Sequence, residues 1–351
     1  MKELLTVQRD LVFGHTDQGV ALTADIYLPN TQGLRPGLLL IHGGGWQKGS
    51  KEAYQEWGPV LAQAGFVAMA VSYRLSSASN VGWPGALEDV RQAFHWMVDH
   101  AQSFQIDPQR IGVIGDSAGG QLAALLTLTH YADSPPGIEA TIRALVGAYG
   151  AYDLTPGQGE QKNYLLERPD HALEHFFGAP FEEAPERYRS GSPINYVAQA
   201  QANSRFDTHF LLMWGNADTV VPPYVEEEFA RQLQQAGKQV QTLMLPGQEH
   251  FWFTPFPVGE GRRMHEYPNT VLLVLFALLG RLPRRQIVMA SILIPLYVLQ
   301  ILLIELPGRL GVIAVSALHP VNAGIMLGLA IFLAHRAWKI TRGDKSNYWE
   351  R

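Results

Sequence analysis

Short, mostly apolar runs alternate with amphipathic stretches along most of the chain. Runs of this length suit strands that are buried on both faces, and they cover residues 38–41, 66–71, 111–114, 144–148, 210–213 and 240–245. Helical patterns lie between or after them, at residues 51–64, 86–102, 118–130, 223–236 and 269–279. The alternation predicts an α/β fold, with a mostly parallel sheet of about eight strands and helices on both faces.

The first thirty residues depart from this pattern. Two β-rich runs, at residues 5–13 and 20–27, flank the polar segment His15-Thr16-Asp17-Gln18-Gly19. Polar residues and a glycine between two such runs are typical of a hairpin turn. The sheet is therefore expected to begin with an antiparallel pair.

Residues 155–202 interrupt the alternation with a segment rich in proline, glycine, glutamate and aromatic residues. In a doubly wound fold, an insertion at this point would sit over the carboxyl ends of the strands, where ligands bind. We interpret it as a cap-like insertion within a catalytic domain of residues 1–280.

The composition changes most sharply after residue 280. Residues 287–304 and 310–334 contain no Asp, Glu, Lys or Arg, and each run is long enough to supply the roughly 18 to 20 residues that cross a bilayer. We predict a two-helix transmembrane hairpin, with helices at about 287–305 and 310–335, within a membrane tail of residues 281–351. A buried helical pair, packed on the first domain or on a second copy of it, is the alternative.

The charges around this hairpin predict its orientation. Arginines and lysines lie outside both apolar runs, at Arg281, Arg284, Arg285, Arg336, Lys339, Arg342 and Lys345. By the positive-inside rule both ends of the hairpin are then cytoplasmic. No apolar stretch of signal-peptide length follows Met1, so export by that route is not expected. We therefore expect the inner (cytoplasmic) membrane, with the catalytic domain facing the cytoplasm; a soluble cytoplasmic protein is the alternative.

Charge and cysteine content exclude several functions. The formal net charge is −5 and no basic stripe is present, which argues against nucleic acid as a partner. The chain has no cysteine, so disulfides, thiolate metal sites and a cysteine nucleophile are excluded. The sequence does not predict an oligomeric state.

A glycine-rich motif lies between a predicted strand and a predicted helix. Gly115-Asp116-Ser117-Ala118-Gly119-Gly120 follows residues 111–114 and leads directly into residues 121–126. An ordinary glycine-rich turn could also contain G-x-S-x-G. The strand before it and the helix after it favour a nucleophile elbow, in which Ser117 is the nucleophile and the glycines remove side chains that would clash.

The run His42-Gly43-Gly44-Gly45-Trp46 ends the predicted strand at residues 38–41. Successive glycines let backbone N–H groups approach a developing oxyanion. Gly43 and Gly44, with Ala118, are the predicted oxyanion-hole donors. His42 could act as a base, but its place in a loop motif favours a structural role, and we expect His42, Gly45 and Trp46 to support the site.

Two later loops can complete a catalytic triad. Asp218 follows the strand at residues 209–213, and His250 follows the strand at residues 240–245. An aspartate in such a loop is by itself ordinary turn chemistry. The order Ser117, Asp218, His250, each after a different strand, predicts that His250 is the general base and that Asp218 orients it.

Together these motifs resemble the hormone-sensitive-lipase-like and feruloyl-esterase-like branch of the α/β hydrolases. The resemblance covers roughly residues 5–279, and its motifs are specific. They are His42-Gly43-Gly44-Gly45-Trp46, Ser72-Tyr73-Arg74-Leu75, Asp107-Pro108-Gln109-Arg110-Ile111, Gly115-Asp116-Ser117-Ala118-Gly119-Gly120 and Gly215-Asn216-Ala217-Asp218-Thr219-Val220-Val221-Pro222.

The resemblance implies a serine carboxylesterase that forms an acyl-enzyme on Ser117 and needs no metal or organic cofactor. It also implies that Asp116 and the region of Tyr73 support the site without reacting. The chain departs from the family after His250, where the usual glycine or alanine is replaced by Phe251-Trp252-Phe253. We expect these rings to narrow the space for the acyl or the leaving group.

Three functions remain open from the sequence. The first is hydrolysis of a small-molecule ester, either lipid-derived or soluble. The second is an amidase or formamidase that uses the same triad. The third is a catalytically silent, membrane-tethered binding protein.

Overall fold

The computed structural model describes residues 5–133, 140–156, 170–202 and 206–254. All of them belong to Met1–Pro268, one of two compact units into which the chain divides. The predicted helix at residues 269–279, the boundary at residue 280 and the apolar hairpin lie outside the described residues. Within the described ranges, no helix is long and apolar enough to cross a membrane.

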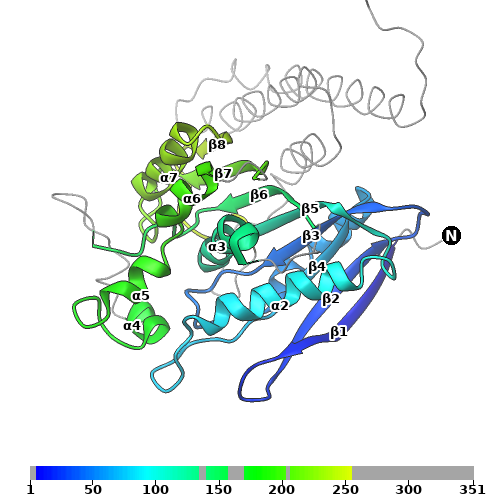
Figure 1. The fold of residues 1–351 in the computed structure, drawn as a ribbon, viewed down its shortest axis with the longest axis horizontal. Helices are drawn as coiled ribbons and strands as arrows, with labels where there is room; N and C mark the ends of the chain where they lie inside the picture. Colours follow the sequence, from blue (N-terminus) through cyan, green and yellow to red (C-terminus); the bar gives the residue numbers. More distant parts are fainter. Residues whose placement is uncertain (1–4, 134–139, 157–169, 203–205, 255–351) are drawn as a thin grey trace, which may run out of the picture. The chain divides into compact units, whose positions relative to one another are not determined.

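Eight strands form one sheet (Figure 1). The pairs β1–β2 and β2–β4 are antiparallel, and all other neighbouring strands are parallel. The order across the sheet is β1-β2-β4-β3-β5-β6-β7-β8. The bounds are β1 Leu5–His15, β2 Ala21–Pro29, β3 Arg35–Ile41, β4 Val67–Val71, β5 Ile106–Asp116, β6 Ile142–Ala148, β7 His209–Gly215 and β8 Gln239–Leu245. The predicted mostly parallel sheet is confirmed.

The predicted hairpin at the start of the chain is also confirmed. The N–H group of Thr16 donates to the carbonyl of Val20, and the N–H group of Gly19 donates to the carbonyl of Thr16, both at 2.9 Å. This turn joins β1 to β2 in antiparallel register. Because β1 forms one edge of the sheet, its side chains are mostly exposed, whereas every residue of the central strand β4 is buried.

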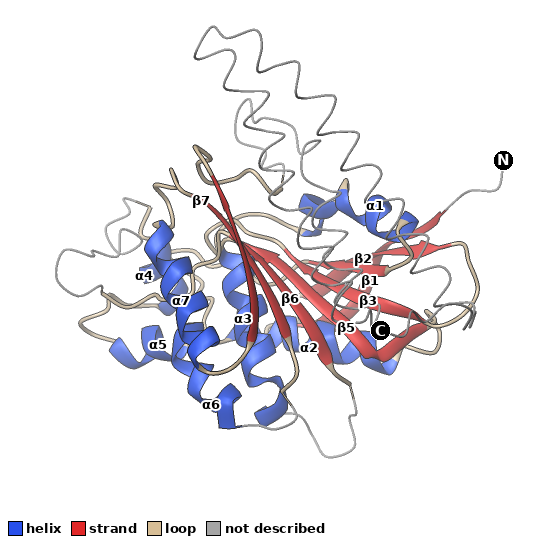
Figure 2. Ribbon diagram, turned by 90° about the horizontal axis from the view of Figure 1, so that it is seen from above, coloured by secondary structure: helices blue, strands red, loops and turns tan. Residues whose placement is uncertain are grey.

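Helices cover both faces of the sheet. In Figure 2, α1 (Trp57–Gln63) lies on one face, and α2 (Gly85–Asp99), α3 (Ala118–Asp133) and α7 (Pro223–Gln235) lie on the other. The sequence predicted one helix over residues 51–64, but the structure has a 3-10 turn, η1 (Lys51–Tyr54), followed by α1. The buried side chain of Lys51 pairs with Asp25 of β2, and its N–H group donates to the Ser72 hydroxyl, which fixes this turn separately from the helix.

The strand register brings the site together. Ile41 at the end of β3 pairs with Gly115, and Asp116 at the end of β5 pairs with Ala148 of β6. The loops that follow these parallel strands therefore all start at the carboxyl ends of the strands, as expected for a doubly wound fold.

Short helices occupy the described parts of the predicted insertion. They are α4 (Ala172–Phe177), α5 (Pro185–Ser190), η2 (Pro193–Tyr196) and α6 (Val197–Ala202). Leu173, Phe176 and Phe177 are buried in the core of the domain, and Figure 1 shows α4 and α5 together at one end of the described fold.

Candidate active site

Ser117 occupies the sharp turn between β5 and α3. Its φ angle is +51°, in the left-handed region that a non-glycine residue adopts only at some cost in energy. The N–H group of Ser117 donates to the carbonyl of Ala148 at 2.9 Å, and its own carbonyl accepts from the N–H group of Gln121 at 3.1 Å. These two bonds hold the turn to the neighbouring strand and begin the helix.

The glycines around Ser117 are required by close backbone contacts. A Cβ atom on Gly115 would overlap the carbonyl of Gly119, and one on Gly119 would overlap the carbonyl oxygens of Ile41 and His42. This is the geometry that the glycine spacing predicted for a nucleophile elbow.

Ser117, His250 and Asp218 form a continuous chain of hydrogen bonds. The His250 Nδ1 atom is 2.6 Å from Asp218 Oδ2, and its Nε2 atom is 2.9 Å from Ser117 Oγ. Because the carboxylate can only accept, Nδ1 carries the proton and Nε2 accepts from the serine hydroxyl. The structure therefore brings together the three residues predicted from loops far apart in sequence.

The other oxygen of Asp218 is held by its own loop. Its Oδ1 atom accepts from the N–H groups of Val220 and Val221 at 2.8 and 2.9 Å. The carboxylate is buried, and these two bonds leave Oδ2 directed at the imidazole. A carboxylate fixed in this way selects one tautomer of His250.

In the glycine loop after β3, one of the predicted oxyanion-hole donors already has an acceptor. The N–H group of Gly43 donates to Asp116 Oδ1 at 3.2 Å, so this amide is already engaged. Among the described residues, none accepts a hydrogen bond from the N–H groups of Gly44, Gly45 or Ala118. Gly44 and Gly45 have φ angles of +125° and +58°, which glycine adopts without strain.

Asp116 is buried and accepts hydrogen bonds from three of the segments around the nucleophile. Besides Gly43, it accepts from the hydroxyl groups of Tyr54 at 3.0 Å and Thr254 at 2.9 Å. Burial raises the pKa of its carboxyl group, and the three donors oppose this shift. Asp116 therefore ties the glycine loop, η1 and the segment after His250 to the elbow.

His42 supports the glycine loop. Its Nδ1 atom is 2.7 Å from the carbonyl of Gly43, and its ring stacks on Tyr73 with centroids 4.3 Å apart. The Tyr73 hydroxyl donates to the carbonyl of His42 at 3.0 Å. Burial lowers the pKa of His42 to about 4, so the imidazole is neutral at pH 7. Among the described residues, no hydrogen bond joins it to Ser117, and its contacts with Gly43 and Tyr73 favour the structural role.

Trp46 connects the glycine loop to the insertion. Its ring stacks on Phe176 of α4 with centroids 4.7 Å apart, and its indole N–H donates to Gln121 Oε1 at 3.0 Å. The Gln121 amide in turn donates to the carbonyl of Gly191 at 2.7 Å. Through these contacts the insertion packs on both the glycine loop and the first turn of α3.

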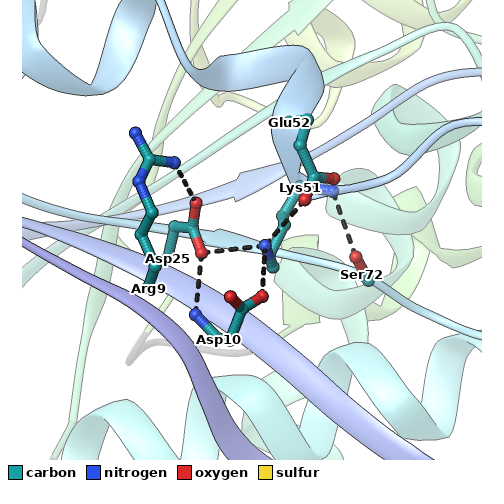
Figure 3. Close-up of polar contacts among 6 residues, drawn as sticks. All are labelled: Arg9, Asp10, Asp25, Lys51, Glu52 and Ser72. Carbon is teal, nitrogen blue, oxygen red and sulfur yellow. Dashed lines mark hydrogen bonds and ion pairs between the residues drawn. The ribbon is translucent and has the colours of Figure 1, made fainter.

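An ionic cluster around the buried pair Lys51 and Asp25 holds the far end of the same loop (Figure 3). The Lys51 ammonium is 2.9 Å from Asp10 Oδ1, 2.9 Å from Asp25 Oδ1 and 2.7 Å from Glu52 Oε1, and Arg9 pairs with the other oxygen of Asp25 at 2.8 Å. The Lys51 ammonium holds the pKa of Glu52 down at about 2. The cluster joins β1, β2 and η1 nine residues after His42.

Sequence reasoning missed several residues that hold the site. The ring of Tyr149 lies 4.3 Å from that of His250, and its hydroxyl accepts from the N–H group of Phe253 at 3.1 Å. Glu226 of α7 accepts from the N–H group of Gly150, and burial raises its pKa. Tyr149 directly follows β6, as Ser117 directly follows β5, so both lie at the carboxyl ends of parallel strands. This position could have identified Tyr149 as a site residue from the sequence. Glu226 lies in a helical pattern that offered no such signal.

The described residues contain no group of three or more His, Asp or Glu side chains arranged to hold a metal ion.

The fold and the hydrogen-bonded triad define the class as an α/β hydrolase. A family model described as BD-FAE matches residues 24–233, well over half of the chain. The chain belongs to this family, which confirms the resemblance drawn from the motifs.

Several curated proteins similar to this chain are named as ester hydrolases. Esterase LipC of Mycobacterium tuberculosis is 31% identical over 248 residues, covering 68% of this chain and 58% of LipC. Ethyl acetate hydrolase of Pseudomonas putida is 32% identical over 221 residues, covering 61% of this chain and 64% of that hydrolase. The chain thus spans about three fifths of the length of these curated relatives.

The fold also matches that of solved structures. Thermogutta terrifontis esterase 2, phosphonylated by sarin, has a TM-score of 0.63 at 23% sequence identity, covering 78% of this chain and 95% of that one.

Proposed function

We propose that this chain is a carboxylic-ester hydrolase that works through an acyl-enzyme on Ser117. The observation that carries the proposal is the hydrogen-bonded chain from Asp218 Oδ2 through both nitrogens of His250 to Ser117 Oγ. The esterase relatives support it independently.

In the first half of the reaction, Ser117 Oγ attacks the ester carbonyl while His250 Nε2 takes its proton. Asp218 stabilises the imidazolium that forms. The proton then passes from His250 to the departing alcohol, and the acyl group stays on Ser117. Water, activated by the same imidazole, attacks the acyl-enzyme and releases the acid.

The tetrahedral oxyanion requires N–H donors that are free in the resting enzyme. We assign this role to Ala118 and Gly44, as the sequence predicted, and to Gly45 in place of Gly43. The amide of Gly43 already donates to Asp116, whereas those of Gly44, Gly45 and Ala118 have no acceptor among the described residues. The N-terminal end of α3 adds a favourable dipole at Ala118.

Turnover of p-nitrophenyl acetate by the full chain and its variants tests the proposal. We expect wild-type activity, a loss of about 10⁴-fold or more in kcat for Ser117→Ala, and a loss of about 10⁴-fold for Asp218→Asn. A fluorophosphonate probe should label the wild type and spare Ser117→Ala. A folded wild type that neither turns over esters nor takes the label would instead favour a silent binding protein.

An amide panel, run beside the esters, tests the amidase alternative. The same machinery can cleave both bonds, so the ratio of kcat/KM for an anilide and the matching phenyl ester decides between them. We expect the ester to be preferred, as the named relatives are ester hydrolases.

We propose further that residues 281–351 attach the enzyme to the cytoplasmic membrane. The two uncharged runs and the cationic residues outside them support this proposal. Alkaline carbonate extraction of membranes from cells expressing the full chain tests it. Retention in the pellet is expected, and complete release into the supernatant would contradict it.

A further inference from the structure

Phe251, the residue after His250, has an unfavourable backbone conformation and an exposed side chain. Its φ angle is +64°, in the left-handed region where glycine is favoured and a bulky residue is strained. Its large apolar side chain is 45% exposed. A phenylalanine is therefore strained at this position, and nearly half of its surface is exposed.

The rest of this segment is buried and anchored. His250 binds Asp218 and Ser117, the carbonyl of Phe253 accepts from the Trp57 indole at 3.0 Å, and Thr254 donates to Asp116. Within residues 250–254, Phe251 alone is exposed. Its ring is thus presented from a fixed loop.

The ring of Phe251 lies against the imidazole that moves the proton. The two ring centroids are 4.4 Å apart and the planes are nearly perpendicular, at 89°. The fully buried ring of Tyr149 also packs on His250, with centroids 4.3 Å apart. Since Tyr149 is inaccessible, Phe251 is the exposed one of these two rings around His250.

The chemistry indicates which part of the substrate comes close to this ring. His250 Nε2 must pass its proton to the oxygen of the departing alcohol, so that oxygen lies within hydrogen-bond reach of the imidazole. The oxyanion is directed instead to the amides of the glycine loop and Ala118. A group attached to the alcohol oxygen is therefore the part of the ester nearest to Phe251.

We infer that Phe251 is a specificity-determining residue that binds the alcohol part of the ester and favours aromatic alcohols. The inference rests on the proposed function, because it requires that His250 protonates the leaving group. An exposed ring held in one orientation offers an apolar face or edge against which a phenyl group packs favourably. Small alkyl alcohols would gain little from it.

The experiment compares phenyl acetate with ethyl acetate in the full chain. Both esters form the same acetyl-enzyme, so their kcat/KM values differ only through the steps that precede release of the alcohol. Phe251→Leu removes the ring but keeps an apolar side chain, Phe251→Gly also relieves the positive φ angle, and Phe251→Tyr keeps the ring.

We expect Phe251→Leu and Phe251→Gly to lower kcat/KM for phenyl acetate about 3- to 10-fold, mainly through KM, and to change that for ethyl acetate less than 2-fold. Phe251→Tyr should retain the wild-type ratio between the two esters. The ratio for phenyl acetate and phenyl butyrate, which share the alcohol, should stay constant in all variants. Phe251→Gly relieves the positive φ angle, so it should melt at a higher temperature than the wild type. A lower kcat/KM in this variant then cannot be attributed to loss of folding.

Equal losses on phenyl and ethyl acetate, or no loss on phenyl acetate in either variant, would overturn the inference while leaving the proposed function intact. A wild type that hydrolyses neither ester and takes no fluorophosphonate label would instead overturn the proposed function.

Discussion

The N–H group of Gly43 donates to Asp116 Oδ1, and this single bond joins the glycine loop after β3 to the residue that precedes the nucleophile. The same bond removes Gly43 from the donors available to a substrate. Asp116 thus holds the loop in place while the next two amides stay free of acceptors in the described chain. The bond connects the two halves of the proposed oxyanion hole.

Asp116→Ala should therefore lower kcat about 10- to 100-fold with little change in KM, because misplaced donors weaken transition-state binding. Steady-state kinetics with p-nitrophenyl acetate measure this effect. Asp116→Asn is the matched control, since its amide oxygen can still accept from Gly43, and it should keep most of the activity. If both variants lose activity equally, the charge of Asp116 matters more than the bond to Gly43.

The glycines of the elbow should differ in their tolerance of a methyl group. A Cβ atom on Gly119 would overlap the carbonyl oxygens of Ile41 and His42, whereas one on Gly120 would lie 3.1 Å from the Cα atom of Gly150. We expect Gly119→Ala to lower the free energy of unfolding by about 3 kcal/mol or to prevent folding, and Gly120→Ala to cost about 1 kcal/mol. Urea denaturation followed by fluorescence measures both, and equal effects would contradict this explanation.

The sequence predicted those features of the fold and the site that depend on local patterns of residues. Apolar runs identified the central strands, and the glycines around Ser117 identified the elbow, because a strand-to-helix turn imposes its own local spacing. The order of Ser117, Asp218 and His250 then followed from the topology of the sheet.

Other parts of the site depend on contacts that leave no local signal. The bond from Gly43 to Asp116 spans 73 positions, and the one from Phe253 to Tyr149 spans 104. The salt bridge from Lys51 to Asp25 depends on two strands and a turn meeting in space. The sequence singled out Gly43 and Asp116 for their motifs and showed the other residues as ordinary polar or aromatic ones. It did not show which residue pairs with which, so the pairs required coordinates.

Removal of the Lys51 ammonium should destabilise the domain. The Asp25 carboxylate is fully buried, and in Lys51→Met it would keep Arg9 but lose one of its two cations. Breaking one side of a buried ion pair leaves charge poorly compensated, so we expect a loss of about 3 kcal/mol in the free energy of unfolding. Lys48→Met is the matched control, because this lysine is exposed in the same loop and its loss should cost less than about 0.5 kcal/mol.

Denaturant unfolding of both lysine variants at low and high salt tests this prediction. Because Lys51 and Asp25 are both buried, the part of the difference between Lys51→Met and the wild type that comes from this pair should change little with ionic strength. Equal stability of the two lysine variants would show that the cluster contributes no more than a surface charge.

The neutral His42 should make the domain sensitive to acid. Burial lowers its pKa from 6.5 to about 4, so the folded state favours the uncharged imidazole. The contribution of the neutral His42 to the free energy of unfolding is fully present above the unfolded-state pKa, and it is lost as the pH falls from about 6.5 towards 4. Over this window it amounts to about 3 kcal/mol.

His42→Asn isolates this contribution from the carboxylates that titrate in the same range. The asparagine amide can still donate to the Gly43 carbonyl in place of Nδ1, which is 2.7 Å away, but it cannot be protonated. Free energies of unfolding of both proteins at pH 7, 6, 5 and 4 are compared. We expect the variant to be less stable at pH 7 and the difference to shrink by about 3 kcal/mol towards pH 4, because only the wild type loses the contribution of a neutral His42. A difference that stays constant with pH would mean that His42 titrates alike in the folded and unfolded chains, and its burial would then have no effect on acid stability.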